Sequence, residues 1–269
     1  MTRVALLGGG KMGAALVGGL LETTFEAADL AVAEVDADRR RELEARFPQV
    51  RVVPSAAWAV ADADVVVVCL KPGDVAEALE SAGAALGAEA LVLSIAAGVT
   101  IAALEAAAPG RPVVRAMPNT PATIGLGAAA IAGGTHAHDG HLDLAEQLLG
   151  AVGLVVRLPE HLLDAVTGLS GSGPAYLFLV AEALVEAGVL VGLPRDVATK
   201  LVNQTLLGAS SLLAQGDDGP EALRAAVTSP GGTTAAGLRS LEAAGVRSAF
   251  IDAVVAATRR STELGEPAT

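Results

Sequence analysis

The chain is poor in aromatic residues and in cysteine. Tryptophan, tyrosine and phenylalanine make up 2% of its 269 residues, so we expect a core built from alanine, valine and leucine. The single cysteine, Cys69, excludes an intramolecular disulfide and stands in the apolar run Val65–Leu70, where we expect a buried, inert thiol. This cysteine usage is typical of a reducing compartment, and we predict a cytoplasmic protein.

Basic residues are scarce relative to acidic ones. The formal net charge of −12 argues against nucleic acid or an anionic membrane surface as the main partner. The most apolar helix expected, Tyr176–Leu190, is interrupted by Glu182 and Glu186, so we predict burial in protein and not in lipid. We also expect no secretory signal before the first strand.

Short apolar runs alternate with helix patterns up to about residue 158. Apolar strands with helices between them predict a parallel sheet covered on both faces, and right-handed crossovers restrict its topology. We therefore predict an α/β domain over residues 1–158. The expected strands are Val4–Leu7, Leu30–Glu34, Arg51–Val53, Val65–Leu70, Leu91–Ile95, Val113–Met117, Ala128–Ala132 and Leu154–Arg157.

After Pro159 the strand-like runs disappear and long helical patterns follow. We predict an all-α domain over residues 159–269, with the boundary near Leu158. The stretch Tyr176–Leu190 is apolar almost all round, which a helix with one solvent-exposed face would not be. A domain of a few helices could hardly bury it alone, so we predict that two copies of the chain pair through this domain as an obligate dimer.

A glycine-rich turn directly follows the first expected strand. The residues Gly8-Gly9-Gly10-Lys11-Met12-Gly13 fit the pattern G-x-G-x-x-G. The first glycine of this pattern allows the tight turn, the second lets a pyrophosphate approach the backbone, and the third allows close packing of helix on strand. The required order of strand, turn and helix is present. We predict a Rossmann-like dinucleotide site that uses Gly8, Gly10, Lys11, Met12 and Gly13.

The sequence leaves the choice between NADH and NADPH open. Glu34 ends the second expected strand, at the place for an acidic residue that binds a ribose 2′-hydroxyl and favours NAD. Arg39, Arg40 and Arg41 follow, and an arginine there can pair with a 2′-phosphate. The three arginines also fit a solvated helix face.

Two further segments follow strands whose carboxyl ends should face the cofactor. They are Leu70-Lys71-Pro72 and Ser94–Val99, and the small residues of the second permit close approach of the ribose or nicotinamide. We assign Leu70 and Lys71 to the cofactor site. Lys71 could act as a catalytic residue, but a lysine that contacts the ribose or faces solvent is the simpler interpretation.

The expected site has no histidine base. His136, His138 and His141 lie in a polar loop, which predicts a solvated turn and no metal site. Reduction of a carbonyl needs an acid to protonate the developing alkoxide, whereas a protonated imine is already an electrophile. An imine substrate would need mainly positioning, an anion site and a hydroxyl donor.

A second glycine-rich turn offers such an anion site. Pro230 ends one helix because it lacks an N–H, and Gly231 and Gly232 leave the backbone bare. Thr233 and Thr234 stand where the next helix begins, as N-cap candidates. Backbone N–H groups at a helix N-terminus bind small anions, although an ordinary interhelical turn explains the local pattern as well.

Three motifs resemble those of pyrroline-5-carboxylate reductase. They are Val-Arg-Ala-Met-Pro-Asn-Thr-Pro at 114–121, Gly-Leu-Ser-Gly-Ser-Gly-Pro-Ala-Tyr at 168–176, and Val-Thr-Ser-Pro-Gly-Gly-Thr-Thr at 227–234 with the trailing Leu241-Glu242. The glycine turn, Lys71-Pro72 and Ser94–Gly98 agree in order and spacing, so the resemblance covers essentially the whole chain. It implies NAD(P)H-dependent reduction of 1-pyrroline-5-carboxylate to L-proline, the last step of proline biosynthesis.

The resemblance also implies an architecture and roles for residues. A Rossmann domain precedes a helical dimerisation domain, dimers often assemble into a ring, and the active site lies between the Rossmann domain of one chain and helices of its partner. Thr234 would hydrogen-bond the ring nitrogen and can donate a proton. The substrate carboxylate would be held, largely through backbone N–H groups, by Ser229, Gly231, Gly232 and Thr233. The nicotinamide ribose would be flanked by Lys71, Pro72, Ala97, Met117, Pro118 and Asn119.

Two other functions compete with this interpretation. A β-hydroxyacid dehydrogenase also has two domains, but it needs a catalytic lysine on the linking helix, and the chain has no lysine between Lys71 and Lys200. A dinucleotide-sensing protein without turnover would keep the glycine turn and lack activity. Glu34 is not the residue expected in a clearly NADPH-preferring reductase, so the cofactor is NADPH or NADH.

Overall fold

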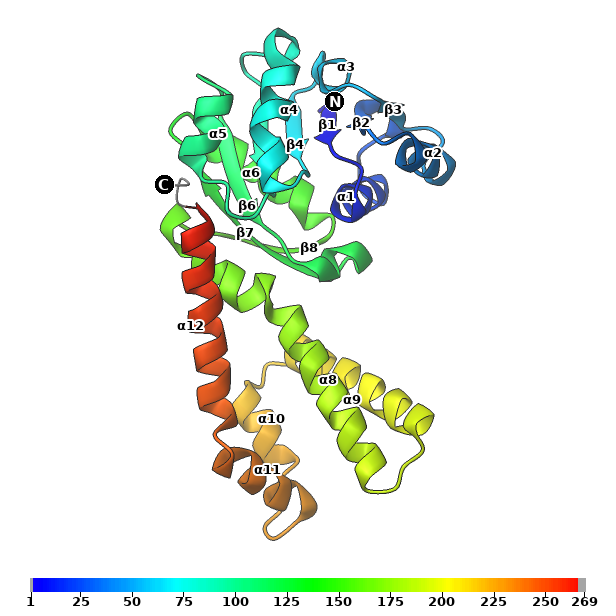
Figure 1. Ribbon diagram of the computed structural model, residues 1–269, viewed down its shortest axis with the longest axis vertical. Helices are drawn as coiled ribbons and strands as arrows, with labels where there is room; N and C mark the ends of the chain where they lie inside the picture. Colours follow the sequence, from blue (N-terminus) through cyan, green and yellow to red (C-terminus); the bar gives the residue numbers. More distant parts are fainter. Residues whose placement is uncertain (1, 266–269) are drawn as a thin grey trace. The chain divides into compact units, whose positions relative to one another are not determined.

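The computed structural model describes residues 2–265, which form two compact units. The sheet unit comprises the chain up to Ser172 together with the C-terminal segment from Val255. The helical unit comprises Gly173–Val254. Figure 1 shows the strands of the sheet unit in blue to green and helices α9 to α11 of the helical unit in yellow to orange.

An eight-stranded sheet forms the centre of the sheet unit, in the order β3-β2-β1-β4-β5-β6-β7-β8. Strands β1 to β6 are mutually parallel, as the alternation of strands and helices predicts. This order is the one that dinucleotide-binding folds use. The strands are β1 Val4–Leu7, β2 Leu30–Ala33, β3 Arg51–Val53, β4 Val65–Val68, β5 Leu91–Ser94, β6 Val113–Met117, β7 Gly127–Gly133 and β8 Gly153–Arg157.

The expectation of a fully parallel sheet is wrong for the last two strands. β7 runs antiparallel to β6, and β8 runs parallel to β7. A parallel connection needs a crossover of a dozen or more residues, whereas residues 118–126 join β6 to β7 with only the short helical turn Thr120–Ile124. The chain reverses there at Gly125, which has a φ of +74°.

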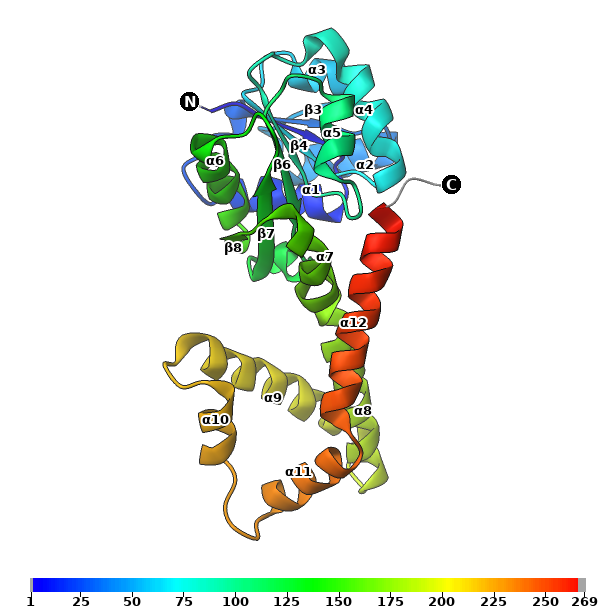
Figure 2. The same ribbon diagram turned by 90° about the vertical axis from the view of Figure 1, so that its left-hand side faces the viewer.

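Helices cover both faces of this sheet and complete two apolar cores. The valine, leucine and alanine side chains of the strands alternate between the two faces. One face is covered by α1 Lys11–Leu21, α2 Ala37–Arg46 and α6 Asp139–Gly150. The other is covered by α3 Ala56–Val60, α4 Val75–Ala82, α5 Ile101–Ala107 and α7 Leu163–Val166. Figure 2 shows α6 and α4 on opposite sides of the strands.

The helical unit exposes much of its apolar surface. Its helices are α8 Gly173–Leu190, α9 Arg195–Gln215, α10 Pro220–Ala226, α11 Thr233–Ala243 and the first part of α12 Val246–Gly265. α8 has no buried residue, and Phe178 and Leu179 are 64% and 66% exposed. By length and composition alone, the helical stretch 160–190 could also cross a membrane. An apolar face of this kind needs a cover that the single chain does not supply.

The compact units differ from the predicted division at residue 158. The sheet unit extends to Ser172 because Leu163 of α7 is buried in the second core. It also includes the end of α12, from Val255 onward. Compactness and function are different criteria, so the assignment of residues 1–158 to cofactor binding and 159–269 to dimerisation and substrate binding stays a prediction.

Candidate active site

The glycine turn between β1 and α1 is formed as the sequence predicts. Gly8 has a φ of +102°, and a Cβ placed on it would lie 2.6 Å from the carbonyl oxygen of Cys69. A Cβ on Gly13 would lie 2.2 Å from the carbonyl oxygen of Gly8. Both positions therefore require glycine for the fold itself, and Gly13 brings helix and strand into close contact.

Gly10 is different because the space into which a side chain would point is open. A Cβ on Gly10 would meet no atom of residues 2–265 within 4 Å. Gly10 is also the N-cap of α1, and no side chain caps this helix. The N–H groups of the first helical turn, from Lys11 onward, are thus available to an anion at the positive end of the helix dipole. This arrangement fits a pyrophosphate.

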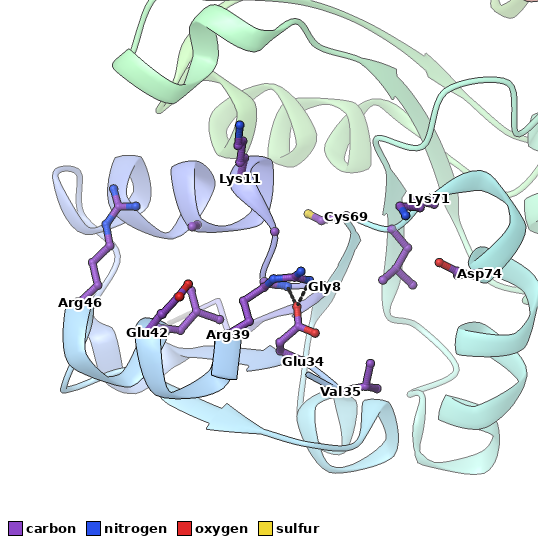
Figure 3. Close-up of a pocket in the computed structure, with 15 residues that line it drawn as sticks. Gly8, Lys11, Glu34, Val35, Arg39, Glu42, Arg46, Cys69, Lys71 and Asp74 are labelled. Carbon is purple, nitrogen blue, oxygen red and sulfur yellow. Dashed lines mark hydrogen bonds and ion pairs between the residues drawn. The ribbon is translucent and has the colours of Figure 1, made fainter. Parts of the chain in front are cut away.

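A cleft of about 710 Å³ opens beside this turn. Figure 3 shows its lining, with Lys11 above the turn, Glu34 and Arg39 below it, and Lys71 on the far side. Of the residues assigned to the cofactor from the sequence, six line the cleft: Gly8, Gly10, Lys11, Glu34, Leu70 and Lys71. Met12 and Gly13 follow in α1 without lining it. The remaining five belong to loops considered below.

Glu34 is buried at the bottom of the cleft and is already hydrogen-bonded. Its Oε2 accepts the N–H of Gly9 at 3.0 Å, and its Oε1 accepts the N–H of Asp36 at 3.0 Å. Arg39 Nη1 lies 3.2 Å from Oε2. A carboxylate has roughly four acceptor positions, so Glu34 keeps capacity for a ribose hydroxyl while it ties the glycine turn to the end of β2.

The three consecutive arginines have three different environments. Arg40 donates from Nη1 to the carbonyl oxygens of Glu34 and Val35, at 2.7 and 2.8 Å. Arg41 pairs with Asp38 on the solvent side of α2. Only Arg39 of the three lines the cleft. Arg41 thus lies on a solvated helix face as interpreted, while Arg39 is also exposed but borders the cleft.

The nicotinamide-side residues follow the carboxyl ends of three neighbouring parallel strands. Pro72 follows β4, Ala97 follows β5, and Met117-Pro118-Asn119 closes β6. In open α/β sheets, ligands bind at this edge. The structure thus brings these segments to one edge of the sheet.

Asn119 has a structural task that the sequence did not reveal. Its Nδ2 donates to the carbonyl oxygen of Ser170 at 3.0 Å, and its Oδ1 accepts the N–H of Ala128 at 2.9 Å. A Cβ on Gly171 would lie 2.7 Å from Cε of Met117. Residues 117–119 therefore connect β7 with the end of the π-helical turn Thr167–Gly171.

Cys69 lies at the edge of the cleft as an unreactive thiol. Burial raises its pKa to about 12. It therefore stays protonated near neutral pH, where a thiolate nucleophile would be needed for covalent chemistry. The raised pKa fits the expected inert thiol, whereas the side chain is half-buried at the cleft and not fully buried as expected.

The second glycine-rich turn lies between α10 and α11. Gly231 has a φ of +69°, and the N–H of Gly232 donates to the carbonyl oxygen of Ser229 at 3.1 Å. Proline followed by a glycine of positive φ is the pattern of a type II turn. The N-cap of α11 is Gly232 without a side-chain cap, so the expectation of a threonine N-cap is wrong.

This turn leaves the start of α11 open. Ala236 donates to the carbonyl of Gly232, the N-cap. The N–H groups of Thr233, Thr234 and Ala235 precede this bond and lack an acceptor inside the helix. The N–H of Gly232, by contrast, is used in the turn itself. An anion at this end of α11 would meet mainly the N–H groups that begin at Thr233.

Glu242, the acidic residue that trails the turn motif, connects three helices. It pairs with Arg224 of α10 at 3.9 Å and with Arg247 of α12 at 2.8 Å. The hydrogen bond from Arg247 holds the pKa of Glu242 below its ordinary value. Glu242 therefore fixes the helices on either side of the turn and stays ionised at neutral pH.

The histidine cluster forms a helix cap. His138 Nδ1 accepts the N–H of Gly140, and His141 Nδ1 accepts the N–H of His138, both at 3.2 Å. The two rings stack with centroids 3.7 Å apart. Among residues 2–265, no group of three or more histidine, cysteine, aspartate or glutamate side chains is placed to hold a metal ion.

Comparisons with known proteins agree with this geometry. Residues 160–264 match the family model for pyrroline-5-carboxylate reductase dimerisation, and residues 3–98 match that for coenzyme F420-dependent NADP oxidoreductases. A pyrroline-5-carboxylate reductase of Corynebacterium melassecola is 42% identical, with 99% of this chain and 100% of the relative covered. One from Mycobacterium tuberculosis is 46% identical, with 98% and 97% covered.

Solved structures of pyrroline-5-carboxylate reductases share the whole fold. The Coxiella burnetii protein matches with a TM-score of 0.94 at 34% identity and covers 99% of both chains. The Plasmodium falciparum protein, solved with NADP bound, matches with a TM-score of 0.85 at 27% identity over 98% of both chains. The sequence-based fold class and resemblance are thereby confirmed. The chain belongs to the pyrroline-5-carboxylate reductase family, and its activity is the NAD(P)H-dependent reduction of 1-pyrroline-5-carboxylate to proline.

Proposed function

We propose that this chain reduces its substrate with the cofactor held at the glycine turn of β1–α1 and the substrate held at the turn between α10 and α11. The observation that carries this proposal is the pair of open helix N-termini, at Gly10 and at Gly232, each preceded by glycines and neither capped by a side chain. One suits a pyrophosphate and the other suits a carboxylate, which are the anionic groups of the two reactants.

The substrate carboxylate is assigned to Ser229, Gly231, Gly232 and Thr233. The open N–H groups that begin at Thr233 support this assignment, and the hydroxyl of Ser229 lies on the same turn. The hydroxyl of Thr234, in the first turn of α11, hydrogen-bonds the ring nitrogen and donates the proton that this nitrogen gains as hydride reaches the imine carbon; solvent then returns a proton to the Thr234 oxygen. No histidine acid is needed beside this hydroxyl.

The cofactor is assigned to Gly8, Gly10, Lys11, Met12 and Gly13 on the pyrophosphate side and to Glu34 on the adenosine side. When bound, a reduced nicotinamide supplies a hydride to the imine carbon. The nicotinamide ribose is flanked by Lys71, Pro72, Ala97, Met117, Pro118 and Asn119, and Leu70 belongs to the same cofactor site. Small side chains, which permit close approach of the ribose, and the hydrogen bonds of Asn119, which fix its loop, support this assignment.

The active form in this proposal is a homodimer, extended to a ring of dimers, in which the α10–α11 turn of each copy serves the cofactor of its partner. The matched dimerisation region and the exposed apolar surface of α8 support the pairing. A second copy of the chain, and not lipid, covers α8. Neither nucleic acid nor membrane is a partner, and the enzyme works in the cytoplasm, as the acidic composition and the single inert cysteine suggest.

One absorbance assay tests the activity. Purified chain is mixed with 1-pyrroline-5-carboxylate and NADPH or NADH, and loss of the reduced nicotinamide band is followed together with proline formation. Formation of one proline for each reduced nicotinamide oxidised supports the proposal. Tight cofactor binding without turnover would instead favour a dinucleotide-sensing protein, and oxidation of a β-hydroxyacid by NADP would favour the dehydrogenase alternative.

A further inference from the structure

Arg115 is a buried cation in the middle of the sheet unit. It belongs to β6 and is 5% exposed. Its Nη1 lies 3.1 Å from Oε1 of Glu160, and its Nη2 lies 3.7 Å from Oδ1 of Asp164. A buried guanidinium needs such partners, because removing it from water is costly. The proposed reaction mechanism uses none of these three residues.

Each carboxylate holds a second element in place. Glu160 Oε1 also accepts the N–H of Ile101, the first residue of α5, at 2.7 Å. Asp164 accepts the hydroxyl of Ser261 at 2.7 Å and that of Thr262 at 3.1 Å, both from α12. Arg115 therefore stands at the centre of one connected set of hydrogen bonds that joins β6, α5 and the end of α12.

The end of α12 packs against the loop that precedes α5. A Cβ on Gly98 would lie 3.6 Å from Cβ of Leu264, and one on Gly265 would lie 3.5 Å from the carbonyl oxygen of Gly98. This loop contains Ala97, which is assigned to the nicotinamide ribose. The Ile101 hydrogen bond fixes the loop at its end, and α12 supports it from the side.

We propose that Arg115, Glu160 and Asp164 are positioning residues that hold the nicotinamide-side loop, residues 95–100, through the last turns of α12. This inference rests on the proposed role of Ala97. α12 belongs to the region that matches the dimerisation family model. The hydrogen bonds around Arg115 therefore connect that region to residues 95–100. Asp164 is the branch point, because both α12 hydroxyls end on its carboxylate.

The test removes the α12 contacts without changing Arg115, Glu160 or Asp164. In the full chain, Ser261→Ala with Thr262→Val deletes both hydroxyl donors to Asp164. We expect NADPH affinity, measured by fluorescence titration, to fall roughly fivefold, within the range of long-range couplings, while the KM for 1-pyrroline-5-carboxylate and the melting temperature change little. Arg260→Ala is the matched control, since Arg260 sits beside Ser261 and its ion-pair partner among residues 2–265 is Glu263; it should bind NADPH like the wild type.

Wild-type NADPH affinity in the double variant would overturn the proposal. Loss of affinity together with loss of the dimer, seen by light scattering, would also overturn it, because α12 would then act through assembly. If the double variant fails to fold, Thr262→Val alone gives the same test, because Thr262 is exposed. Titration needs no turnover, so failure of this inference is distinguishable from failure of the proposed reaction.

Discussion

Glu34 and Gly9 are joined by a hydrogen bond of 3.0 Å between a buried carboxylate and a backbone N–H. This contact ties the end of β2 to the glycine turn that follows β1. Arg39 Nη1 lies 3.2 Å from the same carboxylate oxygen of Glu34, and this ion pair holds Arg39 beside the cleft. The residue that the sequence offers as a ribose acceptor is thus also part of the frame of the cleft.

Arg39 should control the preference between the two nicotinamide cofactors. A guanidinium at this place can leave Glu34 for a 2′-phosphate, which NADH lacks. We expect Arg39→Ala to raise the KM for NADPH by about tenfold, as loss of a charge-assisted hydrogen bond would, and to leave the KM for NADH nearly unchanged. Steady-state kinetics with both cofactors measure the ratio.

Arg41→Ala is the control for this prediction. Arg41 lies on the same helix and pairs with Asp38 on the solvent side, so its removal should shift neither KM. Equal changes for NADPH and NADH in Arg39→Ala would contradict the prediction and leave Arg39 with a purely structural role beside Glu34.

Gly10 and Gly13 of the glycine turn should respond differently to alanine. A Cβ on Gly10 enters empty space, so Gly10→Ala should fold normally and weaken cofactor binding on the order of tenfold, because the methyl group occupies the pyrophosphate position. A Cβ on Gly13 meets the backbone of Gly8 at 2.2 Å, so Gly13→Ala should lower the free energy of unfolding by about 1–3 kcal/mol.

Urea unfolding and cofactor titration of both variants separate these effects. Tight NADPH binding by Gly10→Ala would show that the pyrophosphate does not approach this part of the backbone. A wild-type unfolding curve for Gly13→Ala would mean that helix α1 can shift without cost.

Histidine capping should make helix α6 sensitive to acid. His138 and His141 accept N–H groups through Nδ1, which only neutral rings can do. The pKa of His141 is lowered, first by burial and then by His138. A histidine with a lowered folded-state pKa contributes stability above its ordinary pKa, about 6.5, and this contribution is lost as pH falls from there through the folded pKa.

Hydrogen exchange at α6 between pH 7 and 5 measures this loss. We expect protection of the first turn to fall with pH in the wild type and to fall less in His141→Gln, because glutamine at the N3 position can accept the N–H of the N-cap residue without titrating. His161→Asn, which removes a histidine outside the cap, should behave like the wild type. Protection that is independent of pH in the wild type would contradict the prediction.

Local patterns in the sequence were sufficient for much of the fold and for the glycine turn beside the cleft. The apolar runs located the strands, and the glycine turn lies where its spacing placed it. The direction of β7 was missed because it depends on the length of the connection between β6 and β7. The N-cap of α11 was missed because Gly232, which closes the preceding turn, occupies the N-cap position. The partners of Asn119 and Arg115 were out of reach, since Ser170 and Glu160 lie 51 and 45 positions away in the chain. A lone arginine in the apolar strand Val113–Met117 was the one signal that a buried ion pair exists.

Thr234 carries the most direct test of the reaction. Its hydroxyl is the proposed donor to the ring nitrogen, and its place in the first turn of α11 does not depend on that hydroxyl, because the helix is capped by Gly232. We expect Thr234→Ala to lower kcat by about 10²-fold, a usual loss for a positioned proton donor, with cofactor affinity and melting temperature unchanged. Thr234→Ser keeps the hydroxyl and should retain most of the activity. Wild-type turnover in Thr234→Ala would remove Thr234 from the mechanism, whereas equal losses in the alanine and serine variants would mean that the threonine methyl group, and not the hydroxyl, positions the substrate.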